Sequence, residues 1–496
     1  MHLRKRACGI HLHITSLPSN FGVGDLGPRA LEFVDLLGEA HQNFWGILPV
    51  TPTLREHGDS PYLSSSSFAG NTLLISPVLL EEEGLLKLPN GYQRELTRVD
   101  YRLAHKVKDE IIGRAFQKFQ NRFQDYKCEF EAFCSKNDEW LEDYALYTAL
   151  KDRSSKPWYL WPPPLRDREE KALKKERENL KEAMELESFA QFIFFRQWST
   201  LKEHCRDRGI KVIGDLPFYV NHDSADAWIH PEIFKLDEEK HPLFVSGVPP
   251  DYFSDTGQLW GTPVYDWEHL KSTGFKWWIE RIQHQLSMVD VLRLDHFRGF
   301  SAYWQVPSEA KTAEEGSWVE VPTDEFFDTL ARYCPMLPFI SEDLGDITPE
   351  VREDKDKLGI PGMKVLVFAF GGSPDNPYLP HNHSRNSVVL TGTHDTNTAR
   401  GWFSNASSEI KNNFYGYIGR KISGEEVSWE LVRVAMSSVA NLSILPLQDI
   451  LSLGSEARMN HPTKGEDNWR WRVTADQFIG KAWIRLKEMT EIYGRS

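Results

Sequence analysis

The sequence is poor in cysteine, with five in 496 residues, and no two of them form a C-x-x-C pair. Disulfide frameworks and structural zinc sites need paired cysteines, so this pattern argues against both and indicates a reducing compartment. Apolar runs long enough to span a membrane are also missing. Histidines interrupt the basic N-terminal segment, residues 1–22, before any signal-peptide core forms. We therefore expect a cytoplasmic protein without a membrane partner.

A surplus of positive charge is absent too, because 58 Lys and Arg face 72 Asp and Glu, a formal net charge of −14. Nucleic-acid binding depends on neutralising phosphates, so this balance argues against a nucleic-acid partner. No internal repeat and no low-complexity linker divides the chain. We therefore predict a single domain over residues 1–496, compatible with a small-molecule substrate and with no sign of an obligate protein partner.

What the chain does contain is a succession of short apolar runs bounded by turn residues. There are eight, at residues 7–14, 44–50, 210–220, 289–297, 338–345, 363–370, 387–395 and 442–451. Helical patterns, such as residues 28–42 and 274–288, separate several of them. Continuous apolar strands alternating with helices are typical of a parallel sheet buried on both faces, and eight such units predict an α/β fold, a closed (β/α)8 TIM barrel. A doubly wound open sheet is the main alternative, but no G-x-G-x-x-G turn follows the first strand.

Two long gaps interrupt this alternation. Residues 80–205, approximately, lie between the second and third strands and carry amphipathic and charged helical patterns, so we expect a mostly helical insertion subdomain there. A second insertion is expected over approximately residues 222–285. Its segment 247–267 mixes aromatic residues with glycine, proline and polar residues, and aromatics in such a loop more often contact a ligand than fill a core.

Four of the predicted strands end in acidic residues. In chain order these are Asp215, Asp295, Glu342 with Asp343, and Asp395. The C-terminal ends of barrel strands meet on one face, which is the face that carries active sites. Arg293, His296 and His394 stand beside these acids in the sequence. A single acid is readily explained as a helix N-cap, but four at matching strand ends are not, so we predict a carboxylate-rich site at this face.

Two kinds of chemistry use several carboxylates together with an arginine and histidines. Divalent-metal hydrolysis prefers ligand spacings such as His-x-His, and the pairs His11/His13 and His381/His383 are only a weak signal of that kind. Retaining glycosyl transfer needs an ionised nucleophile and a protonated acid about 5–5.5 Å apart. The sequence favours this second chemistry and predicts neither a metal nor another cofactor.

The neighbours of two acids suggest how the roles are divided. Arg293 lies two residues before Asp295, and its charge would lower the pKa of that carboxyl. Neighbouring carboxylates would raise the pKa of Glu342. We therefore expect Asp295 to be the ionised nucleophile and Glu342 the protonated acid, with His296 placed to donate a hydrogen bond to a sugar hydroxyl.

Several motifs together resemble one enzyme family. They are "SPYLSSSSFAGN", "GVPPDYFSDTGQLWGTPVYDW", "RLDHFRG", "SEDLG" and "GTHDT", followed near the C-terminus by "RMNHP" and "NWRWR". This set resembles the 4-α-glucanotransferases (amylomaltases, or disproportionating enzymes) of glycoside hydrolase family 77, over nearly the whole chain. "RLDH" alone is shared with α-amylase-like barrels in general, whereas the long second motif is more specific.

The resemblance implies a role for individual residues. Asp295 would be the nucleophile, Glu342 the general acid/base and Asp395 the third acid, which binds hydroxyls of the sugar at the cleavage point. Further residues would contact the substrate: Tyr62 beneath the sugar ring, Asp215, Arg293, His296 and His394 around it, Gln258 and Trp260 on the acceptor side in the substrate-covering loop 247–267, and Asn460 at the border of the cleft. The family generally needs no metal, and its substrates are maltooligosaccharides and other α-1,4-glucans.

Two alternatives to transfer remain open at this point. An α-amylase-like hydrolase would use the same carboxylates with water as acceptor, so the difference must lie in the acceptor site. Trp260, Tyr252 and Phe253 could stack an incoming sugar and exclude water, although such aromatics also serve simply to pack a loop. A catalytically silent glucan-binding protein is the second alternative. Such a protein is expected to have lost Asp295 or Glu342, and both are present.

Overall fold

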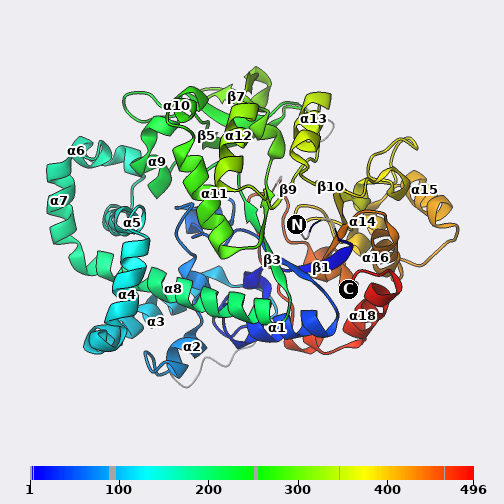
Figure 1. The fold of residues 1–496 in the computed structure, drawn as a ribbon, viewed down its shortest axis with the longest axis horizontal. Helices are drawn as coiled ribbons and strands as arrows, with labels where there is room; N and C mark the ends of the chain where they lie inside the picture. The colour runs from blue at the N-terminus through cyan, green and yellow to red at the C-terminus, as the bar shows by residue number, and fades with distance from the viewer. Residues whose placement is uncertain (1–2, 4, 89–95, 251–254, 346, 463) are drawn as a thin grey trace.

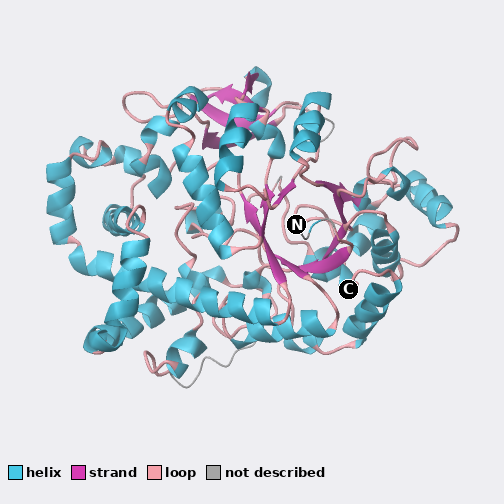
Figure 2. Cartoon of the chain, viewed as in Figure 1, coloured by secondary structure: helices cyan, strands magenta, loops and turns pink. Residues whose placement is uncertain are grey.

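The computed structural model describes residues 3, 5–88, 96–250, 255–345, 347–462 and 464–496. Its centre is a closed barrel of eight parallel strands in the order β1-β12-β11-β10-β9-β6-β3-β2. The strands are β1 (Ala7–His11), β2 (Phe44–Gly46), β3 (Lys211–Leu216), β6 (Val291–Leu294), β9 (Phe339–Ser341), β10 (Gly362–Val365), β11 (Ser387–Leu390) and β12 (Leu442–Pro446). Each coincides with one of the eight predicted apolar runs, with β10 beginning one residue before its run, which confirms the (β/α)8 barrel (Figure 2).

The barrel strands are buried because helices cover the outside of the barrel and the side chains of the strands fill its inside. The helices are α1 (Pro28–Glu39), α2 (Pro77–Glu82), α3 (Tyr101–Asn121), α4 (Phe123–Lys136), α5 (Leu141–Ser154), α6 (Pro163–Arg166), α7 (Glu170–Asn179), α8 (Lys181–Asp207), α9 (Ala225–Ile229), α10 (Trp267–Ser272), α11 (Lys276–Met288), α12 (Thr323–Tyr333), α13 (Pro349–Leu358), α14 (Ala399–Asn405), α15 (Ser408–Ile418), α16 (Val427–Ser437), α17 (Leu447–Ile450) and α18 (Lys481–Ile492).

Helices α2 to α8 occupy the chain between β2 and β3 and extend to one side of the barrel (Figure 1). The long helix α8 packs against both α5 and α3, and its C-terminal part leads directly into β3. The predicted helical content of residues 80–205 is therefore present among the described residues. That this segment forms a subdomain of its own stays a prediction.

A second, smaller sheet was not predicted. Its four antiparallel strands, in the order β5-β4-β7-β8, are β4 (Phe244–Val248), β5 (Gln258–Pro263), β7 (Ala302–Pro307) and β8 (Ser317–Glu320). The turn Phe297–Phe300 leads from the end of β6 into β7. Because it follows the C-terminal end of a barrel strand, this sheet stands at the end of the barrel where the predicted site lies, and β5 carries Gln258 and Trp260 there.

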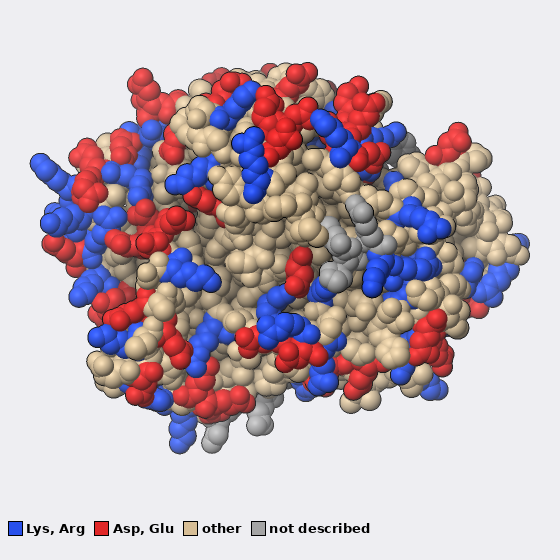
Figure 3. Space-filling model, viewed as in Figure 1, with Lys and Arg blue, Asp and Glu red and all other residues tan. Residues whose placement is uncertain are grey.

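The surface mixes both signs of charge. On the face drawn in Figure 3, lysine and arginine side chains alternate with aspartate and glutamate, and neither sign forms a large continuous patch. Within the described ranges, no helix combines the length and the apolar character that crossing a membrane requires.

Candidate active site

The predicted acids stand at neighbouring strand ends, as the barrel topology requires. Asp215 is the fifth residue of β3, and its Cα partner in the parallel register with β6 is Arg293. Asp295 follows β6, and its amide N–H donates to the carbonyl of Leu216 (3.1 Å). Glu342 follows β9, and its N–H donates to the carbonyl of Leu294 (3.0 Å). Backbone pairing thus brings the three acids onto one rim of the barrel.

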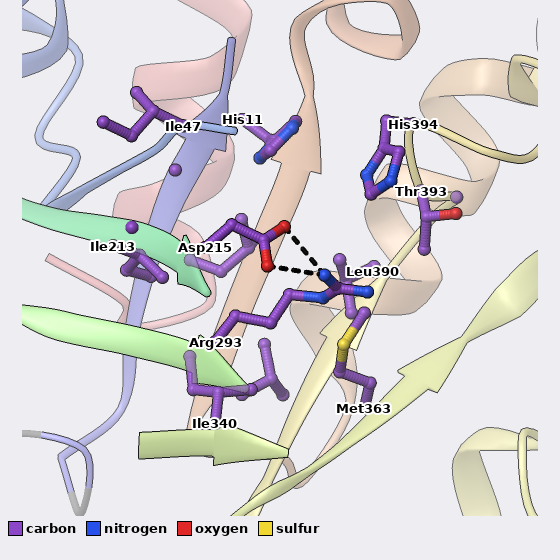
Figure 4. Close-up of a pocket in the computed structure, with 15 residues that line it drawn as sticks. His11, Ile47, Ile213, Asp215, Arg293, Ile340, Met363, Leu390, Thr393 and His394 are labelled. Carbon is purple, nitrogen blue, oxygen red and sulfur yellow. Dashed lines mark hydrogen bonds and ion pairs between the residues drawn. The ribbon is translucent and has the colours of Figure 1, made fainter. Parts of the chain in front are cut away.

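Arg293 connects two of these acids. Its Nη1 lies 2.7 Å from both carboxylate oxygens of Asp215 and 2.9 Å from Asp295 Oδ1. Figure 4 shows the guanidinium group in contact with Asp215 of the neighbouring strand, with His394 beyond the arginine on the other side. The arginine side chain is 13% exposed and that of Asp295 27%, so the pair is screened from most of the solvent. Charge-assisted hydrogen bonds in such surroundings hold the Asp295 carboxylate in one orientation.

Tyr62 and His394 extend this network. The Tyr62 hydroxyl lies 2.8 Å from Asp215 Oδ2 and 2.9 Å from His394 Nε2, and the two rings are stacked with centroids 5.3 Å apart. His394 Nε2 also lies 3.2 Å from Asp395 Oδ2. Asn460 Nδ2 donates to the other oxygen of Asp395 at 2.6 Å. These contacts bring together residues from four widely separated parts of the chain, all of which were predicted for the site.

Glu342 is held by backbone groups. Its Oε2 accepts the N–H of His296 (2.9 Å) and its Oε1 accepts the N–H of Leu344 (3.1 Å). His296 has a left-handed conformation, with φ +48°, which turns its N–H towards the carboxyl group. The Nε2 of His296 is buried and has no hydrogen-bond partner among the described residues.

The adjacent acid, Asp343, has a different environment. It forms a buried ion pair with Lys355 of α13 (3.0 Å) and accepts the backbone N–H of Met363 (2.7 Å). A Cβ at Gly362 would lie 2.1 Å from an Asp343 carboxylate oxygen, which explains the glycine at the start of β10. Asp343 therefore anchors the segment after β9 to the next strand, while Glu342 stands within the site.

The electrostatics give the two central carboxyls different proton affinities. Burial raises the pKa of Glu342 to about 7, and the Asp295 charge adds to this against the opposing effect of Arg293. Burial likewise raises the pKa of Asp295 to about 6, although Arg293 counteracts it. The expected lowering of the Asp295 pKa is therefore wrong in its net sign, because desolvation outweighs the arginine. That Glu342 is the protonated partner and Asp295 the ionised one stays a prediction.

Asp395 and His394 favour the charged form of one another. Burial alone would raise the pKa of Asp395, but the His394 charge and hydrogen bonds from His394 and Asn460 hold it well below its usual range. Burial opposes the charged form of His394, yet the neighbouring Asp395 raises the pKa of the imidazole above its ordinary value. His296 differs, because burial lowers its pKa to about 4 and leaves the ring neutral.

The predicted acceptor-side residues lie on β5. The Trp260 side chain is 39% exposed, and its ring meets His296 edge-on with centroids 4.9 Å apart. Trp260 Nε1 donates to Gln258 Oε1 at 3.3 Å. The structure thus places both residues next to the turn that carries His296. Tyr252 and Phe253, the other two predicted aromatics, lie outside the described residues.

Sequence reasoning missed several residues of this site. His11, the last residue of β1, stacks on His394 with centroids 6.2 Å apart, and its place at a strand end was the available signal. Tyr219 lies near both Trp260 and His296, with centroids 6.1 and 6.3 Å away. Arg458 Nη2 donates to the backbone carbonyl of Asp395 at 2.6 Å, a contact that no local pattern announces.

A cavity inside the barrel lies directly beneath the network. Figure 4 shows its lining, with Asp215, Arg293, His394, Thr393 and His11 on the polar side and Ile47, Ile213, Ile340, Met363 and Leu390 among the apolar residues. The polar network therefore rests on an apolar floor, as expected for a barrel core. Across the described residues, no group of three or more His, Cys, Asp or Glu side chains is arranged to hold a metal ion. That the reaction needs no metal stays a prediction.

Comparison with known proteins agrees with these observations. A family model described as 4-alpha-glucanotransferase matches residues 12–477. The chain is 47% identical to a 4-alpha-glucanotransferase of Aquifex aeolicus, with 99% of both chains covered, and 45% identical to one of Thermus thermophilus, with 98% of both covered. The structure superposes on an amylomaltase of Streptococcus agalactiae, solved in complex with acarbose, with a TM-score of 0.95 at 38% identity, covering 99% of this chain and 100% of the other. The chain therefore belongs to the 4-alpha-glucanotransferase family of enzymes.

Proposed function

We propose that this enzyme transfers a segment of an α-1,4-glucan to the 4-hydroxyl group of an acceptor glucan or glucose, through a covalent glucosyl-enzyme intermediate. The observation that supports it most directly is the pair Asp295 and Glu342 on one barrel rim, with the pKa of Glu342 about 7 and that of Asp295 about 6. Burial raises both pKa values, so the pair retains a proton to higher pH than free carboxyls would, and Arg293 beside Asp295 favours the ionised form of that partner. A retaining glycosyl transfer requires this distribution.

In the first half of the reaction, Glu342 protonates the glycosidic oxygen while Asp295 attacks the anomeric carbon. The bond to the leaving chain breaks and an ester to Asp295 forms, so the proton of Glu342 leaves with the departing hydroxyl group. Arg293 keeps Asp295 oriented, because one of its nitrogens bonds this carboxylate and Asp215 together. The low pKa of Asp395 keeps it ionised, and this charge stabilises positive charge that develops on the sugar ring.

In the second half, Glu342 acts as the base. It takes the proton of the incoming 4-hydroxyl group, whose oxygen attacks the anomeric carbon and releases Asp295, so an α-1,4 link is restored. Water as the acceptor would give hydrolysis by the same steps. We propose that Trp260 and the loop 247–267 favour a sugar, because the half-exposed Trp260 ring beside His296 offers a stacking surface where the acceptor must bind.

The substrate contacts follow from the same geometry. Tyr62, with its ring stacked on His394, is proposed to lie beneath the sugar at the cleavage point. His296 Nε2, which lacks a partner among the described residues, is proposed to bond a sugar hydroxyl. Asn460 orients Asp395 and borders the cleft. The helical insertion, α2 to α8, is proposed to support the segment that carries Tyr62, since Arg55 of that segment pairs with Asp109 of α3.

Incubation with maltotriose in the presence of EDTA tests transfer against hydrolysis. We expect glucose and products longer than maltotriose to accumulate while total reducing ends stay constant. Rising reducing ends without longer products would show a hydrolase instead. Asp295→Asn should abolish the product ladder. Asp290→Asn is the matched control, because Asp290 precedes the same strand at its opposite end, where it pairs with Lys202, and should leave the ladder intact.

The intermediate itself is accessible through Glu342→Gln. With α-glucosyl fluoride, whose leaving group needs no acid, this variant should complete the first half of the reaction and stall in the second, which requires the base. Mass spectrometry should then find one glucosyl unit on the peptide that contains Asp295. The double variant with Asp295→Asn should carry none. An unmodified Asp295 peptide in the single variant would contradict the covalent mechanism.

A further inference from the structure

A second cavity is lined in part by Tyr62. It is enclosed by residues 49–67, by the segment that follows β3 and by helix α11, and it shares Tyr62 and Asp215 with the active site. Its other polar side chains include Thr51, Ser64, Ser66, Ser67, Tyr219 and Arg281. The proposed reaction assigns no role to most of these, although hydroxyl groups and an arginine in one cavity form a donor-rich environment.

Arg281 is the unusual member of this set. Its side chain, from α11, is 2% exposed, and its two terminal nitrogens donate to the backbone carbonyls of Phe218 (3.2 Å) and Pro217 (2.7 Å). Its Nη1 also lies 3.4 Å from the Tyr265 hydroxyl, and the guanidinium group lies over the rings of Trp277 and Trp278, 5.2 and 4.9 Å from their centroids. Among the described residues its Nε has no hydrogen-bond partner and Arg281 forms no ion pair. A buried cation without a directly paired anion is costly in free energy.

The nearest compensating charge is incomplete. Asp226 is close enough to act on Arg281, but its Oδ2 accepts the backbone N–H of Ser67 (2.8 Å) instead. Burial raises the pKa of Asp226 and lowers the pKa of Arg281, so the surroundings disfavour the charged form of both groups. A further negative charge beside Arg281 would offset this effect for the arginine.

Two hydroxyl groups of the cavity are also free to donate. The Tyr219 side chain is 8% exposed, and its oxygen is buried with no partner among the described residues. Ser66 Oγ accepts the backbone N–H groups of Phe68 and Ala69 (both 3.1 Å), which leaves its own proton for another acceptor. Together with Arg281 Nε–H, the cavity offers three donors that lack an assigned acceptor.

We propose that this cavity binds a small monovalent anion of the halide type, held by Arg281, Tyr219 and Ser66. A halide accepts several hydrogen bonds and donates none, which matches a set of donors, whereas water must also donate. A multivalent anion fits poorly, because the carboxylate of Asp215 lines the same cavity even though Arg293 pairs with it. The bound anion would join residues 49–67, which carry Tyr62, to helix α11.

Thermal unfolding tests the site without recourse to activity, so its failure would not affect the proposed reaction. The melting temperature of the whole protein is followed as sodium chloride replaces sodium gluconate at constant ionic strength. We expect a saturable rise with chloride and with bromide. Tyr219→Phe should raise the half-saturating concentration about tenfold, the effect of losing one hydrogen bond to a charged ligand. Arg281 is less suitable for this test, because it also supports two backbone carbonyls.

Tyr303→Phe is the matched control. It removes a hydroxyl from another buried tyrosine, one that donates to the Tyr265 carbonyl outside the cavity, and should leave the half-saturating concentration unchanged. Crystals grown with sodium bromide should show an anomalous peak within hydrogen-bond reach of Arg281 Nε. Equal melting temperatures in chloride and gluconate would overturn the proposal, whether or not a peak appears in the crystal, and so would an equal shift in both tyrosine variants.

Discussion

Arg293 should set the pH range over which the enzyme works. Its Nη1 lies 2.7 Å from Asp215 and 2.9 Å from Asp295, and its charge also acts on Glu342. Arg293→Met removes the cation and leaves the acids facing one another. The pKa of Asp295 should then rise above its present value of about 6. Because Arg293 also lowers the pKa of Glu342, both limbs of the bell-shaped rate profile should move to higher pH.

The size of the shift follows from Coulomb's law. Two unit charges about 4 Å apart at an effective dielectric constant of about 20 interact by about 4 kcal/mol, or about 3 pKa units. Solvent access to the partly exposed Asp295 reduces this to about 2 units. At pH 6.5 the ionised fraction of Asp295 should fall roughly 20-fold or more, and kcat/KM for maltotriose with it. The measurement is kcat/KM between about pH 5 and pH 9, where both limbs can be followed.

Two further variants make this prediction specific. Arg293→Lys keeps the positive charge, so both limbs of its pH–rate profile should stay near those of the unchanged enzyme even if the rate falls. Lys108→Met removes another buried cation, the partner of Asp25, and should lower stability without moving either limb. A folded Arg293→Met enzyme with both limbs in their original places would refute the reasoning. So would a Lys108→Met enzyme whose limbs moved equally.

Three other substitutions test separate parts of the structure. Asn460→Ala removes the 2.6 Å hydrogen bond to Asp395 and should lower kcat/KM for maltotriose about tenfold, measured as initial glucose release. Trp260→Ala should raise the ratio of hydrolysis to transfer several-fold, measured as reducing ends against longer products, whereas Trp318→Ala on the exposed strand β8 should not. Arg495→Met removes a fully buried guanidinium that donates to the backbone carbonyls of residues 7, 435, 436, 438, 440 and 441. It should lower the free energy of unfolding, measured in urea, by about 3–5 kcal/mol. Arg206→Met, at an exposed position, should not lower it in this way.

The barrel was predictable because of where its strands lie. A strand buried on both faces must be apolar along its length, and runs such as residues 387–390 therefore stand out in the sequence. The site was predictable for a related reason, because an acid that interrupts such a run at its C-terminal end has to face the barrel mouth. Asp215, Asp295 and Glu342 all follow this rule.

The small antiparallel sheet escaped prediction because its strands do not carry that signal. β5 contains the exposed Leu259 and Trp260 next to Gly261, and the residues of β8, Ser317–Glu320, are mostly exposed. Part of the pairing is set by tertiary contacts, since β4 pairs with the nearby β5 on one side and, on the other, with β7, which follows the barrel strand β6. The direction of the pKa shift of Asp295 was also predicted wrongly. Sequence proximity showed the arginine but not the depth of burial, which proved the larger effect.

The charges of the site serve two separate purposes. Arg293 pairs with Asp215 and Asp295 through one nitrogen, and Arg458 donates to the backbone carbonyl of Asp395 rather than to its carboxylate. The pKa of Asp395 lies well below its usual range, so its carboxylate stays ionised. In the proposed reaction the transition state develops positive charge on the sugar ring, and this carboxylate stabilises it more than it stabilises the neutral substrate. Arg293 thus orients the proposed nucleophile, Asp295, while the ionised Asp395 favours the transition state.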